Sequence, residues 1–311
     1  MKIYDAHCDV LSKMWNDPTL SFLDGADLHT NLKQMRSAGA GLQLFAIYIP
    51  ERVPDSAKFD CALEMVEIFY ERIVKPYDDV IAVYSKEDIE RLPAGKIGAM
   101  LTLEGCDAIG REITRLKALI RLGVRSVGLT WNYGNAACDG ILESRGSGLS
   151  DFGKRIVDVH NEYDIWTDVS HLSVKAFWDV MDHANHVIAT HSNVKKICAH
   201  PRNLDDDQLK ALIKKDAVIG VTFVPKFLRN DRNASIADII EHIDYISSLG
   251  GISNIALGSD FDGIDHVPSN LRSYEDYPKL IEELERRYSN KEVEGFLWRN
   301  LLERIPSKGR I

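Results

Sequence analysis

The sequence predicts an α/β protein, a (β/α)8 TIM-type barrel, and three observations support this. Eight short apolar runs alternate along the chain with longer amphipathic stretches, the pattern of strands and helices in a parallel sheet. Eight strands close such a barrel, which commonly needs about 250 residues or more, and this chain has 311. No GxGxxG or GxxxxGK(S/T) motif follows the first apolar run, which disfavours the runner-up, a doubly wound open sheet.

The eight predicted strands are rich in Ile, Val, Leu, Thr and aromatic residues, and most of them end in Gly, Ser, Asp or Asn. The connection 50–96 is expected to hold a helix over about 57–75 and a short extra element at 80–85. This long connection is the natural place for a lid or a dimer contact. The predicted strands cover 3–9, 42–49, 97–104, 125–131, 164–171, 186–192, 217–224 and 254–262.

Five amphipathic stretches predict helices between these strands. Ser150 and Ser173 are candidate N-caps, and the carboxylates at 205–207 suit the positive end of a helix. We expect all these elements to form a single domain over residues 1–311. The predicted helices cover 150–163, 173–184, 205–215, 235–250 and 275–288.

The charge and composition exclude several classes of protein. Lys and Arg number 38 and Asp and Glu 47, which gives a formal net charge of −9. An acidic chain without a basic block is a poor binder of nucleic acid or anionic membranes, and no apolar run reaches the ~18 residues of a membrane span. The N-terminal MKIYDAHCDV lacks the apolar run of a secretory signal, and the five cysteines form no CxxC pair. We therefore expect a cytoplasmic protein with reduced thiols.

Residue types that bind metals follow five of the eight predicted strands. In barrels of this kind the reacting groups lie at the C-terminal ends of the strands. The two-residue period of a strand puts His7 and Asp9 on one face, while Cys8 points toward the helices. Imidazole and carboxylate donors without a thiolate suit Zn, Mn, Fe or Co. The candidates are His7, Asp9, Glu104, His171, His191 and Asp260.

The number of candidates predicts two metal ions. Five ligand candidates besides Asp260 exceed the three protein ligands of an ordinary catalytic zinc site. One carboxylate can bridge two cations about 3.5–4 Å apart. Glu104 is the best bridging candidate, since its strand lies between the first strand and the strands that precede the two later histidines. Asp260 can complete a metal site or hold the attacking water.

Each candidate also has a structural interpretation. Asp9 and Asp262 can be turn residues or helix N-caps, Glu104 can be a surface group in a loop, and a single histidine after a strand is most often structural. A nucleophilic Cys106 or Cys138 is disfavoured, because neither has an evident histidine partner. Several ligand types at successive strand ends favour the metal site over packing alone.

At these residues the chain resembles the membrane dipeptidase (renal dipeptidase) family of metallopeptidases, within the amidohydrolase-like barrels. The resemblance runs nearly end to end, and the order and spacing of its segments are more specific than any one segment. It implies a binuclear zinc site and the hydrolysis of dipeptides. The matching segments are DAHCD (5–9), TLEG (102–105), GLSDFGKRIV (148–157), DVSHLS (168–173), THS (190–192), PRN (201–203), DFDG (260–263) and YPKLIEEL (277–284).

The resemblance also implies a role for each matching residue. His7 and Asp9 would hold one zinc ion, and Glu104 would bridge the two. Asp260 would position the nucleophile and shuttle its proton. Arg202 would grip the free C-terminal carboxylate of the substrate, because a planar guanidinium meets a carboxylate with two hydrogen bonds. The second zinc ion would be held by His171 and His191.

One position departs from the family pattern. The family usually has a histidine after the fourth strand, in an LTH context, and that residue is associated with the scissile group. Here the sequence is Leu129-Thr130-Trp131-Asn132. Trp131 neither accepts a hydrogen bond nor carries a charge, whereas Asn132 can donate one bond to the substrate. Removal of one such donor can lower a rate about 10²–10³-fold, so the change bears on transition-state stabilisation and substrate preference.

The resulting prediction is a zinc-dependent dipeptidase that cleaves free dipeptides with a metal-activated hydroxide. The resemblance permits a D-residue at the C-terminal position and a homodimer. Two alternatives stay open: a metal-dependent hydrolase of N-acyl amino acids, lactones or phosphoesters on the same barrel, and a non-catalytic binding barrel. The effect of Arg202→Ala separates the dipeptidase from the first alternative, and turnover of any dipeptide excludes the second.

Overall fold

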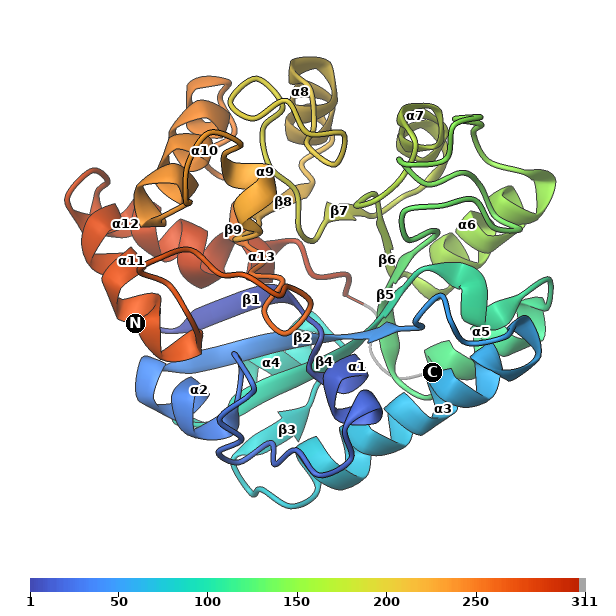
Figure 1. Ribbon diagram of the computed structural model, residues 1–311, viewed down its shortest axis with the longest axis horizontal. Helices are drawn as coiled ribbons and strands as arrows, with labels where there is room; N and C mark the ends of the chain where they lie inside the picture. Colours follow the sequence, from blue (N-terminus) through green and yellow to red (C-terminus); the bar gives the residue numbers. More distant parts are fainter. Residues whose placement is uncertain (308–311) are drawn as a thin grey trace. The chain divides into compact units, whose positions relative to one another are not determined.

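The computed structural model describes residues 1–307 and contains the predicted parallel sheet (Figure 1). Its strands are β1 (Ile3–Cys8), β2 (Ala40–Tyr48), β3 (Val80–Ala82), β4 (Ile97–Glu104), β5 (Val124–Gly128), β6 (Trp166–Asp168), β7 (Val187–Ala189), β8 (Val218–Val221) and β9 (Ile255–Leu257). Their order is β2-β1-β9-β8-β7-β6-β5-β4-β3, and β2 also pairs with β4. Eight strands therefore close the (β/α)8 TIM-type barrel, as predicted, and β3 is the extra element expected within 80–85.

Contacts between Cα atoms divide the chain into two compact units. The first unit comprises Met1–Leu44 and Ala189–Arg304, and the second comprises Phe45–Ile188 with the described residues from Ile305 onward. Two of the three divisions along the chain fall inside β2 and β7. The single domain expected over 1–311 stays a prediction, and its last residues, 308–311, lie outside the described range.

The first unit carries the helices that belong to β1, β8 and β9. They are α1 (Val10–Asn16), α2 (Leu32–Ala38), α8 (Asp206–Lys214), α9 (Pro225–Leu228), α10 (Ile236–Ser248), α11 (Tyr277–Glu285), α12 (Asn290–Glu294) and α13 (Asn300–Glu303). Helix α11 packs beside both α10 and α12 (Figure 1). The predicted acidic start of α8 is a capping box of Asp205 and Gln208, which satisfies two backbone N–H groups at the helix start.

The second unit carries the helices that follow β2 to β6. They are α3 (Lys58–Ile68), α4 (Lys86–Glu90), α5 (Ile113–Arg121), α6 (Asp151–Tyr163) and α7 (Val174–His183). Helix α6 packs beside α5 and α7 (Figure 1). Ser150 and Ser173 cap α6 and α7 as predicted. The helix expected over 57–75 changes at Phe69–Val74 into a wider π-helical turn. Within residues 1–307, every helix is too short or too polar to cross a membrane.

Five strands, β5 to β9, end at least three residues earlier than the sequence predicted, and all of them except β8 precede candidate site residues. β5, β6 and β9 stop short of 131, 171 and 262. His171, Asp260 and Asp262 have φ angles of 69°, 63° and 69°, which an extended strand cannot contain. The apolar composition that predicted a longer last strand reflects burial instead, since Phe261 is fully buried in this turn. The site residues after β6 and β9 therefore lie on turns.

Two buried histidines predict that the protein loses stability in acid. Burial lowers the pKa of His160 to about 3 and that of His242 to about 4. Both stay neutral in the folded protein, whereas an unfolded chain protonates them below about pH 6.5. The free energy of unfolding should therefore fall as the pH drops from about 6.5 toward 4. Each histidine contributes about 1.4 kcal/mol per pH unit to this fall.

Urea unfolding between pH 7 and pH 4 measures this slope. His160→Gln removes one titrating group, so the variant should lose stability at pH 7 but show a shallower dependence on pH than the unmodified chain. The matched control is His183→Gln, because His183 lies exposed at the end of α7. Equal slopes for His160→Gln and the unmodified chain would contradict the neutral buried state.

Candidate metal centre

The predicted site residues divide between the two units. Each of them lies at the C-terminal end of a strand or in the loop that follows it. This is the end of the strands at which barrels of this kind carry their active sites. The first unit contains His7, Asp9, His191, Arg202 and Asp260, and the second contains Glu104, Asn132 and His171.

In the first unit, His7, Asp9 and Asp260 form one group of ligand-type side chains. Their donor atoms all lie within 4.8 Å of one another. His7 Nε2 lies 3.2 Å from Asp9 Oδ2 and 3.8 Å from Asp260 Oδ1. Burial raises the pKa of the Asp260 carboxyl well above its usual range; the imidazole of His7 opposes this shift and the carboxylate of Asp9 adds to it. Asp9 is buried and the Asp260 side chain is 14% exposed, and two carboxylates so close together repel each other unless a cation or a proton lies between them.

Asp9 provides the test of whether a metal ion fits. It occupies the N-cap position of α1, but its side chain makes no capping hydrogen bond. Its Oδ1 is buried and has no hydrogen-bond partner among residues 1–307. A buried polar atom without a partner destabilises the folded protein by about 1–3 kcal/mol. A bound ligand for this oxygen is therefore expected. Imidazole and carboxylate donors are usual ligands of divalent transition metals, and the group therefore fits such an ion.

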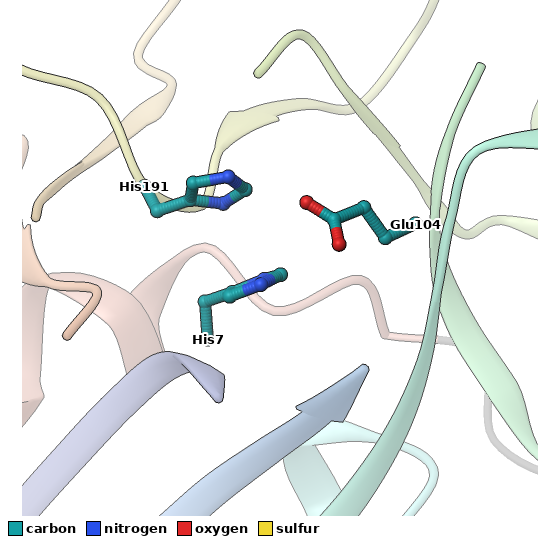
Figure 2. A group of neighbouring side chains, drawn as sticks. All are labelled: His7, Glu104 and His191. Atoms are coloured by element: carbon teal, nitrogen blue, oxygen red, sulfur yellow. The ribbon is translucent and has the colours of Figure 1, made fainter. Parts of the chain in front are cut away.

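His191 and Arg202 complete the candidates of the first unit. The imidazole rings of His191 and His7 face each other with centroids 4.0 Å apart and planes inclined by 35° (Figure 2). Arg202 is only 4% exposed, so it is not the surface arginine of the structural interpretation. Its Nη2 donates to the His191 carbonyl at 3.2 Å, and its guanidinium lies 5.4 Å from the ring centroid of Phe227.

Glu104, also labelled in Figure 2, belongs to the second unit and pairs there with His171. Glu104 Oε1 lies 2.9 Å from His171 Nε2, and the two side chains are 9% and 7% exposed. The interpretation of Glu104 as a surface group is therefore wrong. His171 Nδ1 lies 2.9 Å from Asn132 Oδ1. When that oxygen accepts a hydrogen bond from Nδ1–H, Nε2 keeps its lone pair for a cation.

The contact between Asn132 and His171 is a feature that the sequence analysis missed. Asn132 was assigned a hydrogen bond to the substrate, which stays a prediction, whereas in the structure its side chain orients a candidate ligand. The two residues are 39 positions apart and lie in different loops. No local spacing in the sequence signals such a pair.

Asp5 and Ser259 form a second contact that the sequence analysis missed. Asp5 is fully buried in β1, and burial raises the pKa of its carboxyl. It accepts hydrogen bonds from Ser259 N at 2.8 Å and from Ser259 Oγ at 2.6 Å. These bonds join the strand that carries His7 to the residue before Asp260. The sequence did hold a signal for this contact, a carboxylate inside an apolar strand. Buried carboxylates are almost always paired, so a partner for Asp5 could have been expected.

The DFDG segment has two further structural roles. The Asp262 side chain is fully buried and accepts from Lys13 Nζ at 3.1 Å, His29 N at 2.7 Å and Thr30 N at 2.9 Å. It therefore ties the loop before α2 to the turn after β9. Gly263 has no room for a side chain, because a Cβ there would lie 2.2 Å from Asp9 Oδ2 and 2.6 Å from Asp260 Oδ1.

Replacing Asn132 with alanine is expected to weaken metal binding by about 10–100-fold, the usual cost of losing a group that orients a metal ligand. Asn132→Asp keeps an acceptor for His171 Nδ1 and should restore most of the affinity. Titration of the metal-depleted protein with Zn²⁺ measures both values. Asn135→Ala is the control in the same loop, because its amide bonds to the Leu129 carbonyl. Unchanged Zn²⁺ affinity in Asn132→Ala would contradict the orienting role.

Fold and site together define a class of protein: a (β/α)8 barrel with imidazole and carboxylate groups gathered at the strand ends, the architecture of metal-dependent hydrolases. Comparison with protein families identifies the particular group within that class. The model of the membrane dipeptidase family, peptidase family M19, matches residues 1–307. The chain belongs to this family, which supports the assignment of a metal-dependent hydrolase with dipeptidase chemistry.

Individual proteins are also similar to this chain in sequence or in fold. An uncharacterized protein in the pqqA 5' region of Klebsiella pneumoniae is 38% identical over 231 residues, which cover 70% of this chain and 85% of that protein. The fold resembles a metallopeptidase from Rhodobacter sphaeroides, solved with a phosphinate mimic of the dipeptide L-Ala-D-Ala, with a TM-score of 0.91, 24% identity and coverage of 98% and 99% of the two chains. It also resembles the dipeptidase AC, with a TM-score of 0.89, 25% identity and 98% coverage of both chains.

Proposed function

We propose that this protein is a zinc dipeptidase that hydrolyses the peptide bond of free dipeptides, including those with a D-residue at the C-terminal position. The observation that carries the proposal is the group of His7, Asp9 and Asp260, in which two carboxylates and an imidazole converge and the buried Asp9 Oδ1 lacks a partner among residues 1–307. This group belongs to a member of the dipeptidase family. A relative of similar fold was solved with a dipeptide mimic, which supports the substrate class.

Two zinc ions are proposed. His7 and Asp9 would hold one ion, His171 and His191 would hold the other, and Glu104 would be a ligand of both. When bound, divalent ions supply Lewis acidity and lower the pKa of water at the site. The contact of Asn132 with His171 supports this assignment, because histidine ligands usually donate their second ring N–H to an oxygen that fixes the ring.

The remaining chemistry is assigned to groups of this chain. Asp260 accepts a proton from the attacking water as the new carbon–oxygen bond forms at the peptide carbonyl. It then gives that proton to the leaving nitrogen as the carbon–nitrogen bond breaks, so that two free amino acids result. Arg202 binds the C-terminal carboxylate, and its burial strengthens this charge-assisted hydrogen bond. A free carboxylate is therefore required of the substrate.

Arg202→Ala tests the carboxylate contact. We expect kcat/KM for a dipeptide to fall about 10–100-fold, the effect of losing one charge-assisted hydrogen bond pair. The same substitution should change little for the corresponding dipeptide amide, which lacks the carboxylate. Steady-state kinetics of both substrates with both proteins give the comparison. Equal losses on dipeptide and amide would show that Arg202 does not recognise the carboxylate.

The function itself is tested by release of free amino acids from a panel of L-L and L-D dipeptides, with zinc supplied and a chelated control. Release that depends on the metal would support the dipeptidase. No release from any dipeptide by protein that holds its zinc would overturn it. N-acyl amino acids, lactones and phosphoesters would then be assayed as the alternative substrates. A homodimer and a cytoplasmic location stay predictions, which light scattering and cell fractionation can check.

A further inference from the structure

An aromatic cluster stands beside a proposed metal ligand in the second unit. The ring of Trp131 lies with its centroid 6.1 Å from that of His171, and the two planes are inclined by 35°. Tyr48 and Tyr133 flank the same indole at 5.3 Å and 6.4 Å. Trp131 and Tyr48 are half-buried and Tyr133 is 49% exposed. Three large rings, of which Trp131 stands beside His171, thus keep part of their surface open.

The backbone fixes Trp131 on both sides. A Cβ on Gly105 would lie 3.1 Å from the backbone N of Trp131, so the Trp131 backbone packs closely against the residue that follows Glu104. On the other side, Asn132 bonds to His171. The backbone that carries the indole is therefore a short segment held between two candidate metal ligands, Glu104 and His171. A rigid aromatic surface binds an apolar group at a low cost in conformational entropy.

We propose that Trp131, Tyr48 and Tyr133 form an aromatic subsite that binds a large apolar or aromatic side chain on the N-terminal residue of the dipeptide; this rests on the proposed function. The attacked carbonyl belongs to the N-terminal residue, and that residue's Cβ is only two bonds from the reacting carbon. The C-terminal side chain begins one bond further away, across the scissile nitrogen. The N-terminal side chain is therefore the one nearer to the reacting carbon, and we assign it to the rings beside His171.

Kinetics with L-Phe-L-Ala and L-Ala-L-Ala test the subsite in the zinc-loaded protein. The unmodified chain should prefer L-Phe-L-Ala by about 10–100-fold in kcat/KM, the usual range for filling an apolar pocket. Trp131→Ala should bring the two substrates to within about 3-fold, through a loss that is larger on L-Phe-L-Ala than on L-Ala-L-Ala and lies mainly in KM. Trp131→Phe should keep most of the preference. Trp178→Ala is the matched control, because Trp178 lies exposed on α7 and should leave the preference unchanged.

A binding measurement separates failure of the subsite from failure of the proposed function. Calorimetric titration of the chelated protein with both dipeptides should show tighter binding of L-Phe-L-Ala, and Trp131→Ala should remove the difference. Tyr133→Ala, at a more exposed position, gives a second variant if Trp131→Ala does not fold. Cleavage of both dipeptides with an unchanged preference in the Trp131 and Tyr133 variants would overturn the subsite and keep the dipeptidase. A Trp131-dependent difference in binding without any cleavage would support the subsite and overturn the dipeptidase. If neither dipeptide is cleaved and the two bind equally well, the subsite and the dipeptidase are both overturned.

Discussion

Asp260→Asn is expected to lower kcat by about 10²–10⁴-fold, the range for loss of a general acid–base group. The amide has nearly the shape of the carboxyl but cannot accept the proton of the attacking water. KM should change little, because Asp260 is not assigned to substrate binding. The profile of kcat against pH should also lose the part that reflects the ionisation of Asp260 in the unmodified chain. Steady-state kinetics with zinc supplied measure all three quantities.

The control for this substitution lies in the same loop. Asp265 is exposed, and Asp265→Asn makes the same change in charge, so its kcat should match that of the unmodified chain. Metal analysis of both variants shows whether zinc is retained. If Asp260→Asn keeps both its zinc and a kcat close to the original value, Asp260 is not the proton carrier.

Gly263→Ala is expected to cost at least about 10–100-fold in metal affinity, comparable to the loss of a group that orients a ligand, together with most of the activity. The new methyl group would lie 2.2 Å from Asp9 Oδ2 and 2.6 Å from Asp260 Oδ1. Both distances are far below van der Waals contact, so both carboxylates have to move. Zinc titration of the metal-depleted protein and dipeptide kinetics at saturating zinc give the two losses separately.

Gly250→Ala separates this steric effect from ordinary backbone strain. Gly250 has a φ of 91° and open space around the position of a Cβ. Alanine there should cost stability, on the order of 1 kcal/mol for a left-handed backbone, and should leave zinc affinity and kcat unchanged. Gly263→Ala should show the reverse pattern, with nearly normal thermal unfolding. A Gly263→Ala protein with normal zinc affinity would mean that the carboxylates have room to move aside.

The sequence predicted the barrel well because the signals for strands and helices are local. The alternation of apolar runs with amphipathic stretches gave all eight barrel strands, and Ser150 and Ser173 cap their helices as expected. The ends of the strands near the site were wrong. The turns at His171 and Asp260 have positive φ angles, and a residue's type gives little sign of such a backbone unless it is glycine.

The candidate residues could be proposed from the sequence, because barrels of this kind carry their reacting groups at the C-terminal ends of the strands. The sequence did not predict the hydrogen bonds and the close packing that hold these residues in place. The bonds from Asn132 to His171 and from Ser259 to Asp5 join residues far apart in the chain. The steric role of Gly263 depends on where two carboxylates converge. Folding brings the residues of each contact together, so no spacing along the chain indicates it.

The left-handed turns at the site set a limit on how far this protein can be stabilised. His171, Asp260 and Asp262 are three of the five non-glycine residues within 1–307 that have positive φ, a conformation that costs about 1–3 kcal/mol per residue when it is strained. Glycine at His171 or Asp260 would relieve that cost but would remove a group proposed for catalysis. Selection for activity therefore opposes selection for thermal stability at these positions. Substitutions that raise the melting temperature without loss of activity belong elsewhere in the chain.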